Sequence, residues 1–196
     1  MAENKIKYGL ESVYYAVATI ATTGSATYGT PVALPGAVNL SLAPQGDTTK
    51  FYADNIAYWT GVSNSGYEGD LEVARLTEAF KTDILGYKRD DKDVLIEDAN
   101  AVPTHFALLF QFEGDQKATR HVMYNCVATR PDATGSTKNE SVEPQTETVT
   151  ISCSSIYVST LGSGMDIVKG ESAASTESTT YSSWFTTVHV PSTLHT

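Results

Sequence analysis

The sequence is short of positive charge, of cysteine and of long apolar runs. Its 196 residues include 13 Lys and Arg against 23 Asp and Glu, which gives a formal net charge of -10 at pH 7. Proteins that bind nucleic acid or an anionic membrane carry clustered Lys and Arg on one surface. The acidic balance of this chain therefore argues against nucleic-acid binding and against membrane binding. An acidic wall can still face DNA without binding it, because like charges repel.

No apolar run is long enough to span a bilayer, and the first residues, MAENKIKYGLESVYYAV, lack the apolar centre of a signal peptide. We therefore expect a protein that is made and used in the cytoplasm, without membrane insertion. The two cysteines, Cys126 and Cys153, lie in strand-like runs without CxxC spacing. Two buried thiols are favoured over a disulfide between adjacent strands.

Catalytic motifs are missing as well. The four histidines have neither HExxH nor HxH spacing, and no GxSxG elbow, P-loop or dinucleotide-binding glycine pattern occurs. His121, next to Arg120, could serve a hydrolase as general base if a carboxylate lay opposite it. A strand histidine at the surface or in an interface is the favoured interpretation, and no enzyme, metal or cofactor is expected.

What the chain has in abundance is Ser, Thr, Gly and short β-branched or aromatic runs, which favour a mainly β fold with one core. In the run HFALLFQFEGD, residues 106, 108, 110 and 112 share one apolar face, and Ala107 and Leu109 make the second face partly apolar. This strand is expected to be covered on both sides. In the next run, strict alternation puts Val122, Tyr124 and Cys126 on one face and Met123 on the other.

Three other segments stand out. Residues 43–67 are expected to form an extended hairpin or arm between two strands. One short helix is expected over residues 77–85, with Thr77 as its N-cap, a stripe through Phe80 and Ile84, and Gly86 at its C-terminal cap. A polar loop is expected over residues 132–144. After a β domain of residues 1–157, the Ser/Thr-rich residues 158–196 are expected to form a weakly ordered extension with a short strand or docking arm at YSSWFTTVHV.

The stretch from Phe51 to Val73, FYADNIAYWTGVSNSGYEGDLEV, carries the densest chemistry. Its aromatic side chains suit either sugar stacking or a protein interface, and the interface is favoured. Its carboxylates Asp54, Glu68 and Asp70 could cage calcium, but the spacing of a helix–loop–helix calcium loop is missing.

Five segments together resemble one family: YGTPVALPGAVNLSL, FYADNIAYW, YEGDLEVARLTEAFKTDILG, FALLFQFEGDQKATRHVMYNCVATRP and EPQTETVTI. From about Tyr8 to about Ile151, the chain is similar to the major tail protein, or tail tube protein, of bacteriophages with long non-contractile tails. The resemblance implies a β-sandwich or half-barrel with one flanking helix and an extended hairpin or arm. It also implies assembly into stacked hexameric rings, whose lumen holds the tape-measure protein and later passes DNA without specific binding.

No catalytic residue comes with this resemblance. It implies a virion tail protein, assembled in the host cytoplasm, whose partners are further copies of itself, the tape-measure protein and tail-completion proteins. On this interpretation, we expect inter-subunit contacts from Phe51, Tyr52, Asn55, Tyr58, Trp59 and Tyr67. We expect lumen or rim charge from Asp54, Glu68 and Asp70. The alternative is a carbohydrate-binding or host-attachment module of the same virion.

Overall fold

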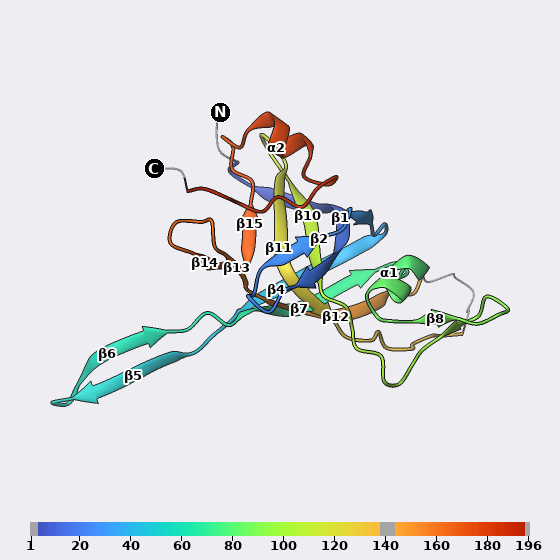
Figure 1. Cartoon of the computed structure of the whole chain (residues 1–196), viewed down its shortest axis with the longest axis horizontal. Helices are drawn as coiled ribbons and strands as arrows, with labels where there is room; N and C mark the ends of the chain where they lie inside the picture. Colours follow the sequence, from blue (N-terminus) through green and yellow to red (C-terminus); the bar gives the residue numbers. More distant parts are fainter. Residues whose placement is uncertain (1–3, 138–143, 195–196) are drawn as a thin grey trace.

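The computed structural model describes residues 4–137 and 144–194, and residues 138–143 of the predicted polar loop lie outside it. Within the described residues, nine strands form one antiparallel sheet, which confirms the mainly β prediction (Figure 1). The main path of the sheet runs through β2 (Ala26–Tyr28), β1 (Lys7–Ile20), β10 (Phe106–Gly114), β11 (Thr119–Ala128), β12 (Glu147–Ser154), β7 (Gly66–Val73) and β4 (Ala37–Gln45). Off this path, β3 (Val32–Ala33) pairs with β1, and β15 (Lys169–Glu171) pairs with β11.

Shorter elements surround this sheet. Three two-stranded hairpins are formed by β5 (Thr48–Ala53) with β6 (Ile56–Val62), β8 (Lys88–Arg89) with β9 (Leu95–Ile96), and β13 (Ile156–Val158) with β14 (Met165–Ile167). The helices of the described residues are α1 (Glu78–Asp83) and α2 (Ser178–Ser182). With six and five residues, both are too short to cross a membrane.

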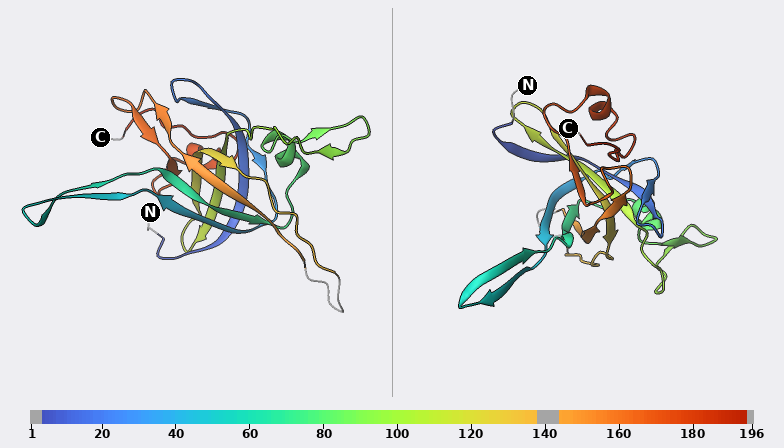
Figure 2. Two further views of the ribbon diagram at one scale, coloured as in Figure 1. Left: turned by 90° about the horizontal axis from the view of Figure 1, so that it is seen from below. Right: turned by 60° about the vertical axis from the view of Figure 1, so that its left-hand side comes forward.

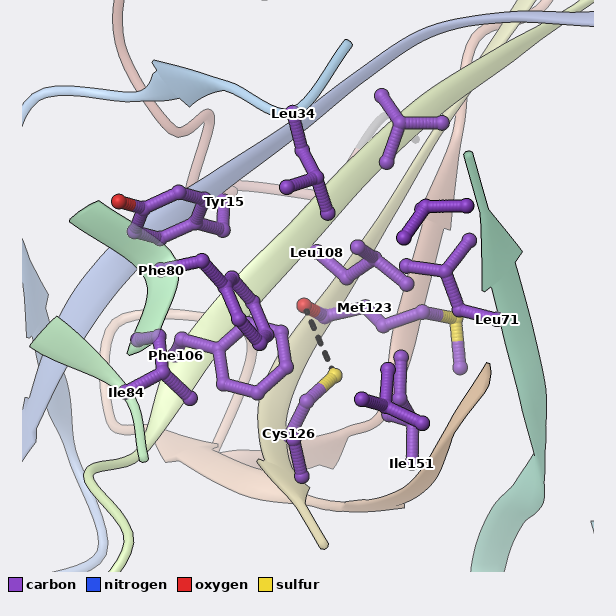
Figure 3. Close-up of a cluster of buried hydrophobic side chains, with 14 of the residues drawn as sticks. Tyr15, Leu34, Leu71, Phe80, Ile84, Phe106, Leu108, Met123, Cys126 and Ile151 are labelled. Atoms are coloured by element: carbon purple, nitrogen blue, oxygen red, sulfur yellow. Dashed lines mark hydrogen bonds between the residues drawn. The ribbon is translucent and has the colours of Figure 1, made fainter. Parts of the chain in front are cut away.

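The sheet curls around one apolar cluster, here called the interior cluster. As the alternation predicts, Phe106, Leu108 and Phe110 of β10 belong to it, together with Val149 and Ile151 of β12. Figure 3 shows Phe106, Leu108 and Ile151 in this cluster. Phe80 and Phe106 contact each other edge to face, with ring centres 5.8 Å apart. The polar residues that alternate with Val149 and Ile151 on β12 point outward, as expected for a strand with one buried face.

The predicted short helix is confirmed and closes one end of the curled sheet. Thr77 precedes α1, and its hydroxyl accepts a hydrogen bond from the Phe80 N–H at 3.2 Å, which satisfies one free donor of the first turn. Gly86 follows with φ +74°, a left-handed conformation that glycine adopts without a steric penalty. The stripe through Phe80 and Ile84 is fully buried in the interior cluster.

The predicted faces of β11 are wrong at one step. Phe106 pairs with Cys126 and Leu108 with Met123, so a single residue of β10 lies opposite two residues of β11 between these pairs. This β-bulge shifts the alternation, and Met123 and Cys126 therefore share the interior, with the Cys126 thiol directed at the Met123 carbonyl (Figure 3). Val122 and Tyr124 lie on the outer face of the sheet.

The C-terminal segment, residues 158–194, covers half of that outer face. A weakly ordered linker followed by a short strand or docking arm was the expectation from its Ser/Thr-rich composition. In the structure, β15 extends the sheet, and α2 ends two residues into YSSWFTTVHV, whose remaining residues form a docked coil. Trp184 and Val188, both buried, pack with Leu109, Val122 and Tyr124 in a second apolar cluster, here called the outer cluster. Over its described residues, the C-terminal segment is therefore packed against the sheet through these apolar side chains.

Candidate assembly surfaces

The hairpin of β5 and β6 projects from the sheet as an arm, defined here as residues 46–65 (Figures 1 and 2). Its large aromatic side chains are exposed to between 56% and 71%, and they are Phe51, Tyr52, Tyr58 and Trp59. Ile56 and Val62 extend the same apolar surface at 61% and 78% exposure. Sequence reasoning missed these two residues because it selected only the aromatic members of an apolar hairpin.

Local geometry, rather than burial, shapes the tip of the arm. Asp54 and Asn55 form the two-residue turn, with φ values of +52° and +61° between the paired residues Ala53 and Ile56. Positive φ at both positions is the requirement of the tightest hairpin turns, and Asp and Asn tolerate it better than other non-glycine residues. The exposed tip therefore carries the Asp54 and Asn55 side chains.

The arm is hydrogen-bonded to the sheet at its root. The Ser63 N–H donates to the Asp47 carbonyl at 3.0 Å, and the Ser65 N–H donates to the Gln45 carbonyl at 2.8 Å. The Ser63 hydroxyl also accepts from the Asp47 N–H at 2.9 Å. These bonds continue the ladder of β4 and β7, so the arm is an extension of two sheet strands and not a separate loop.

Tyr67 differs from the other five residues predicted for assembly. It lies on β7 just after the arm, is half-buried, and packs against the interior cluster. The Lys169 ammonium lies 5.9 Å from the centre of its ring. The structure thus places Tyr67 at the root of the arm and the other five residues on the arm itself.

Glu68 and Asp70 lie on the uncovered half of the outer face, which is formed by β12, β7 and β4. Cross-strand register aligns Ser41, Asp70 and Thr150 in one row. The Thr150 hydroxyl donates to the Asp70 carboxylate at 2.8 Å, and Thr146 donates to Glu72 at 2.7 Å. The outward positions in the aligned rows include no Lys or Arg, and they are Asn39, Ser41, Ala43, Glu68, Asp70, Glu72, Thr148, Thr150 and Ser152. We call this surface the acidic face.

Comparison with known proteins identifies the family of this chain. A family model described as phage tail tube protein matches residues 2–162. The chain belongs to the phage tail tube protein family. No curated protein and no solved structure matches the chain. Membership of this family gives the protein a structural, non-enzymatic role in the tail of a phage virion.

The carboxylates considered for calcium do not converge in this tail tube protein. Asp54 lies at the tip of the arm, whereas Glu68 and Asp70 lie on β7 in the sheet. Within residues 4–137 and 144–194, no group of three or more His, Cys, Asp or Glu side chains is arranged to hold a metal ion.

His121 has a carboxylate nearby but not the environment of a general base. Its Nδ1 lies 3.6 Å from a Glu171 carboxylate oxygen, while its ring stacks on Phe110 with ring centres 5.0 Å apart. Burial lowers the pKa of His121 to about 4, although the Glu171 carboxylate acts in the opposite direction. The imidazole is 7% exposed and belongs to the packing of the sheet, consistent with the non-enzymatic role of tail tube proteins.

The two cysteines are free and buried, which confirms that prediction. Cys126 and Cys153 are direct partners across β11 and β12, with their sulfur atoms 3.0 Å apart. Burial, followed by the neighbouring Cys153, raises the pKa of the Cys126 thiol well above its usual value. Both thiols therefore act as small apolar side chains of the interior cluster.

Proposed function

We propose that the protein self-assembles into hexameric rings that stack into the tube of the phage tail, the conduit for DNA delivery. The observation that carries this proposal is the arm, which holds four large aromatic side chains, each more than half exposed, away from a well-packed sheet. Exposed apolar surface of this kind marks a protein interface, because burying it on a partner stabilises the complex. The tube is assembled in the host cytoplasm.

The assembly contacts are assigned to Phe51, Tyr52, Asn55, Tyr58, Trp59 and Tyr67. The aromatic members of this set have polar tips or broad faces, which protein interfaces favour, and Asn55 at the tip supplies a hydrogen-bonding group. The edge strand β4 adds a second means of association. Among the described residues it has a hydrogen-bonded neighbour, β7, on one side only, so a strand from another copy can pair with its open edge.

The acidic face is assigned to the lumen. Glu68 and Asp70 are exposed on it, and a wall of carboxylates repels DNA phosphates, so the duplex slides past without lodging. Asp54, on the tip of the arm, is assigned to the rim of the ring. During assembly the lumen holds the tape-measure protein, and tail-completion proteins bind the ends of the tube.

Residues 1–157 are proposed as the tail tube domain and residues 158–196 as an extension appended to it. Support comes from the family match, which stops at residue 162, and from the way the extension packs onto an outer face that the sheet already presents. On this proposal, the extension covers the apolar outer face of β1, β10 and β11 and so prevents that face from associating with other molecules.

Electron microscopy of the concentrated protein, beside a variant without the arm, tests the proposal. Gln45 and Gly66 are direct partners at the ends of β4 and β7, so residues 46–65 can be replaced by an Asn-Gly turn without opening the sheet. The full chain is expected to form rings or tubes, and the armless variant is expected to stay monomeric or to stop at shorter assemblies.

Thermal unfolding of the two proteins as monomers provides the control. The armless variant is expected to keep the unfolding temperature of the full chain within a few degrees, because the arm adds nothing to the interior cluster. Full-length protein that remains monomeric at high concentration, with or without tail-completion proteins, would contradict the proposal. So would an armless variant that assembles as readily as the full chain.

A further inference from the structure

The interior of the curled sheet has two ends that differ in how they are closed. At one end α1 inserts Phe80, whose ring contacts Tyr15 and Phe106 edge to face at 5.1 and 5.8 Å. Every residue of that contact is fully buried. The helix therefore acts as a plug for this end of the apolar core.

The opposite end is open. A cavity of about 200 Å³ lies there, and its apolar lining comes from Leu40, Leu42, Tyr67, Phe110, Phe112 and Met123. Several of these side chains pack against the interior cluster but are only partly buried. We call this the open-end cavity. An apolar core that reaches solvent through such a cavity loses the stabilisation that a covering group would supply.

Two lysines lie in the lining of the open-end cavity. Lys7 and Lys169 belong to its lining, and the Lys7 ammonium lies 4.5 Å from the centre of the Phe112 ring. The facing carboxylate is Glu171, 3.5 Å from the Lys169 ammonium. His121 also lines the cavity, and within the described residues its Nε2 atom is buried without a hydrogen-bond partner. Two ammonium groups against one carboxylate leave a local positive excess on a chain whose net charge is -10.

The tip of the arm has the complementary chemistry. Asp54 places a carboxylate in the turn, and Tyr52 and Ile56 beside it are 63% and 61% exposed. An anionic group flanked by apolar side chains matches a cavity with an aromatic wall and two lysines at its mouth.

We propose that the open-end cavity receives the tip of the arm, Tyr52–Ile56, from a second copy of the chain. Asp54 lies between Lys7 and Lys169, and Tyr52 and Ile56 pack on the wall formed by Phe110 and Phe112. This inference rests on the proposed self-assembly and names the site at which the arm binds.

The arm cannot fill the cavity of its own chain. Leu42 and Tyr67, which line the cavity, belong to the strands that lead directly into the arm. At a rise of about 3.3 Å per residue, the six or seven residues of each arm strand carry the tip roughly 20 Å away from this root. Figures 1 and 2 show the arm pointing away from the sheet, on the side opposite α1. Each copy thus offers a tip and a cavity, and a contact between different surfaces of identical copies can propagate into rings or stacks.

Cysteine cross-linking between two single variants tests the contact directly. Asp54→Cys protein is mixed with Lys169→Cys protein under assembly conditions and then oxidised. A disulfide-linked dimer of one of each is expected, because both native thiols are buried. The matched control is Lys92→Cys, an exposed lysine in the turn between β8 and β9, which is expected to give no such dimer with Asp54→Cys.

Charge reversal tests the chemistry of the contact. Asp54→Lys is expected to raise the protein concentration needed for assembly by about tenfold or more, and adding Lys7→Glu and Lys169→Glu is expected to restore most of it. If wild-type tubes form but neither the cross-link nor the rescue is seen, the cavity assignment is overturned while the proposed function stands. If the wild-type chain does not assemble under any condition, the proposed function fails and this inference fails with it.

Discussion

Trp184 and Trp59, the two tryptophans of the chain, lie in regions that use the same side chain in opposite ways. Trp184, from the C-terminal segment, is 3% exposed and donates its indole N–H to the His121 carbonyl at 3.3 Å. Trp59, on the arm, is 56% exposed, and its ring lies over Gly61, where a Cβ atom would overlap it. The first is buried in the folded chain, whereas the second is presented to solvent, where the proposed assembly would bury it on a neighbouring copy.

The comparison separates two ways of keeping a segment ordered. The C-terminal segment is held by apolar contacts with a sheet face formed earlier in the chain. The arm is held by its turn and by the hydrogen bonds at its root, since a two-stranded hairpin alone is only marginally stable. Substitutions in the two regions should therefore change different measurements.

The largest effect is expected at the centre of the interior cluster. Phe106→Ala removes a fully buried ring that packs on Phe80, and it should lower the free energy of unfolding by about 3–5 kcal/mol. Denaturant unfolding of the monomer measures this loss. Val62→Ala on the arm, at 78% exposure, is the control and should change the same quantity by less than about 0.5 kcal/mol. A loss below about 1 kcal/mol for Phe106→Ala would show that the cluster is not the core that the contacts indicate.

The next effect concerns the C-terminal segment. Trp184→Ala should cost about 3 kcal/mol, because it removes the largest side chain of the outer cluster together with an indole hydrogen bond. Amide hydrogen exchange should show lost protection first at Lys169–Glu171, the strand that this segment adds to the sheet. Trp184→Phe retains most of the apolar area and should lose only about 1 kcal/mol. Unchanged protection in the alanine variant would mean that the segment does not depend on this anchor.

Local patterns in the sequence were sufficient to predict much of the fold. Alternation located β10 and β12, and a cap, a four-residue stripe and a following glycine located α1. The faces of β11 could not be predicted, because a bulge depends on how the neighbouring strand pairs. The detailed packing of the C-terminal segment could not be predicted for a related reason. Its few anchors, such as Trp184 and Val188, are diluted in Ser and Thr, and their burial depends on strands roughly sixty positions earlier.

In the candidate site, too, local features could be predicted from the sequence and features set by distant strands could not. Short β-type runs separated by polar breaks were enough to predict an extended hairpin or arm over residues 43–67, because strand and turn preferences are local. The position of its turn, at Asp54 and Asn55, came from the structure. The open-end cavity could not be predicted from sequence, since its lining comes from distant strands that meet only in the folded sheet. The half-buried position of Tyr67 has the same origin, because it is set by packing against the interior cluster.

A third prediction uses pH to separate the sheet from the arm. Burial lowers the pKa of His121 to about 4, whereas an unfolded histidine titrates near 6.5. Below about pH 6.5 the histidine is protonated in the unfolded chain but stays neutral in the folded chain. The contribution of neutral His121 to the free energy of unfolding is therefore fully present above that pH and is lost progressively toward pH 4. Relative to His121→Phe, the wild-type chain should lose on the order of 2 kcal/mol between pH 7 and pH 4.5.

Denaturant unfolding at a series of pH values measures this difference. The armless variant should show the same response as the full chain, because His121 lies in the sheet and contacts Phe110 and Phe112. If the full chain and His121→Phe declined in parallel, the histidine would not be held neutral by burial. If removing the arm abolished the response, the sheet and the arm would be coupled in the monomer.

The smallest effect on stability is expected for Trp59→Ala, which should change the free energy of unfolding of the monomer by less than about 0.5 kcal/mol. The same substitution should strongly weaken assembly, because it removes the exposed indole that the proposed contact buries on a neighbouring copy. In a Trp184→Phe background, Trp59 is the remaining tryptophan, and its fluorescence reports on the arm alone. Acrylamide should quench this emission readily in the monomer and poorly in assembled tubes. Emission already shielded in the monomer would place Trp59 against its own chain, and the contrast with Trp184 would then be lost.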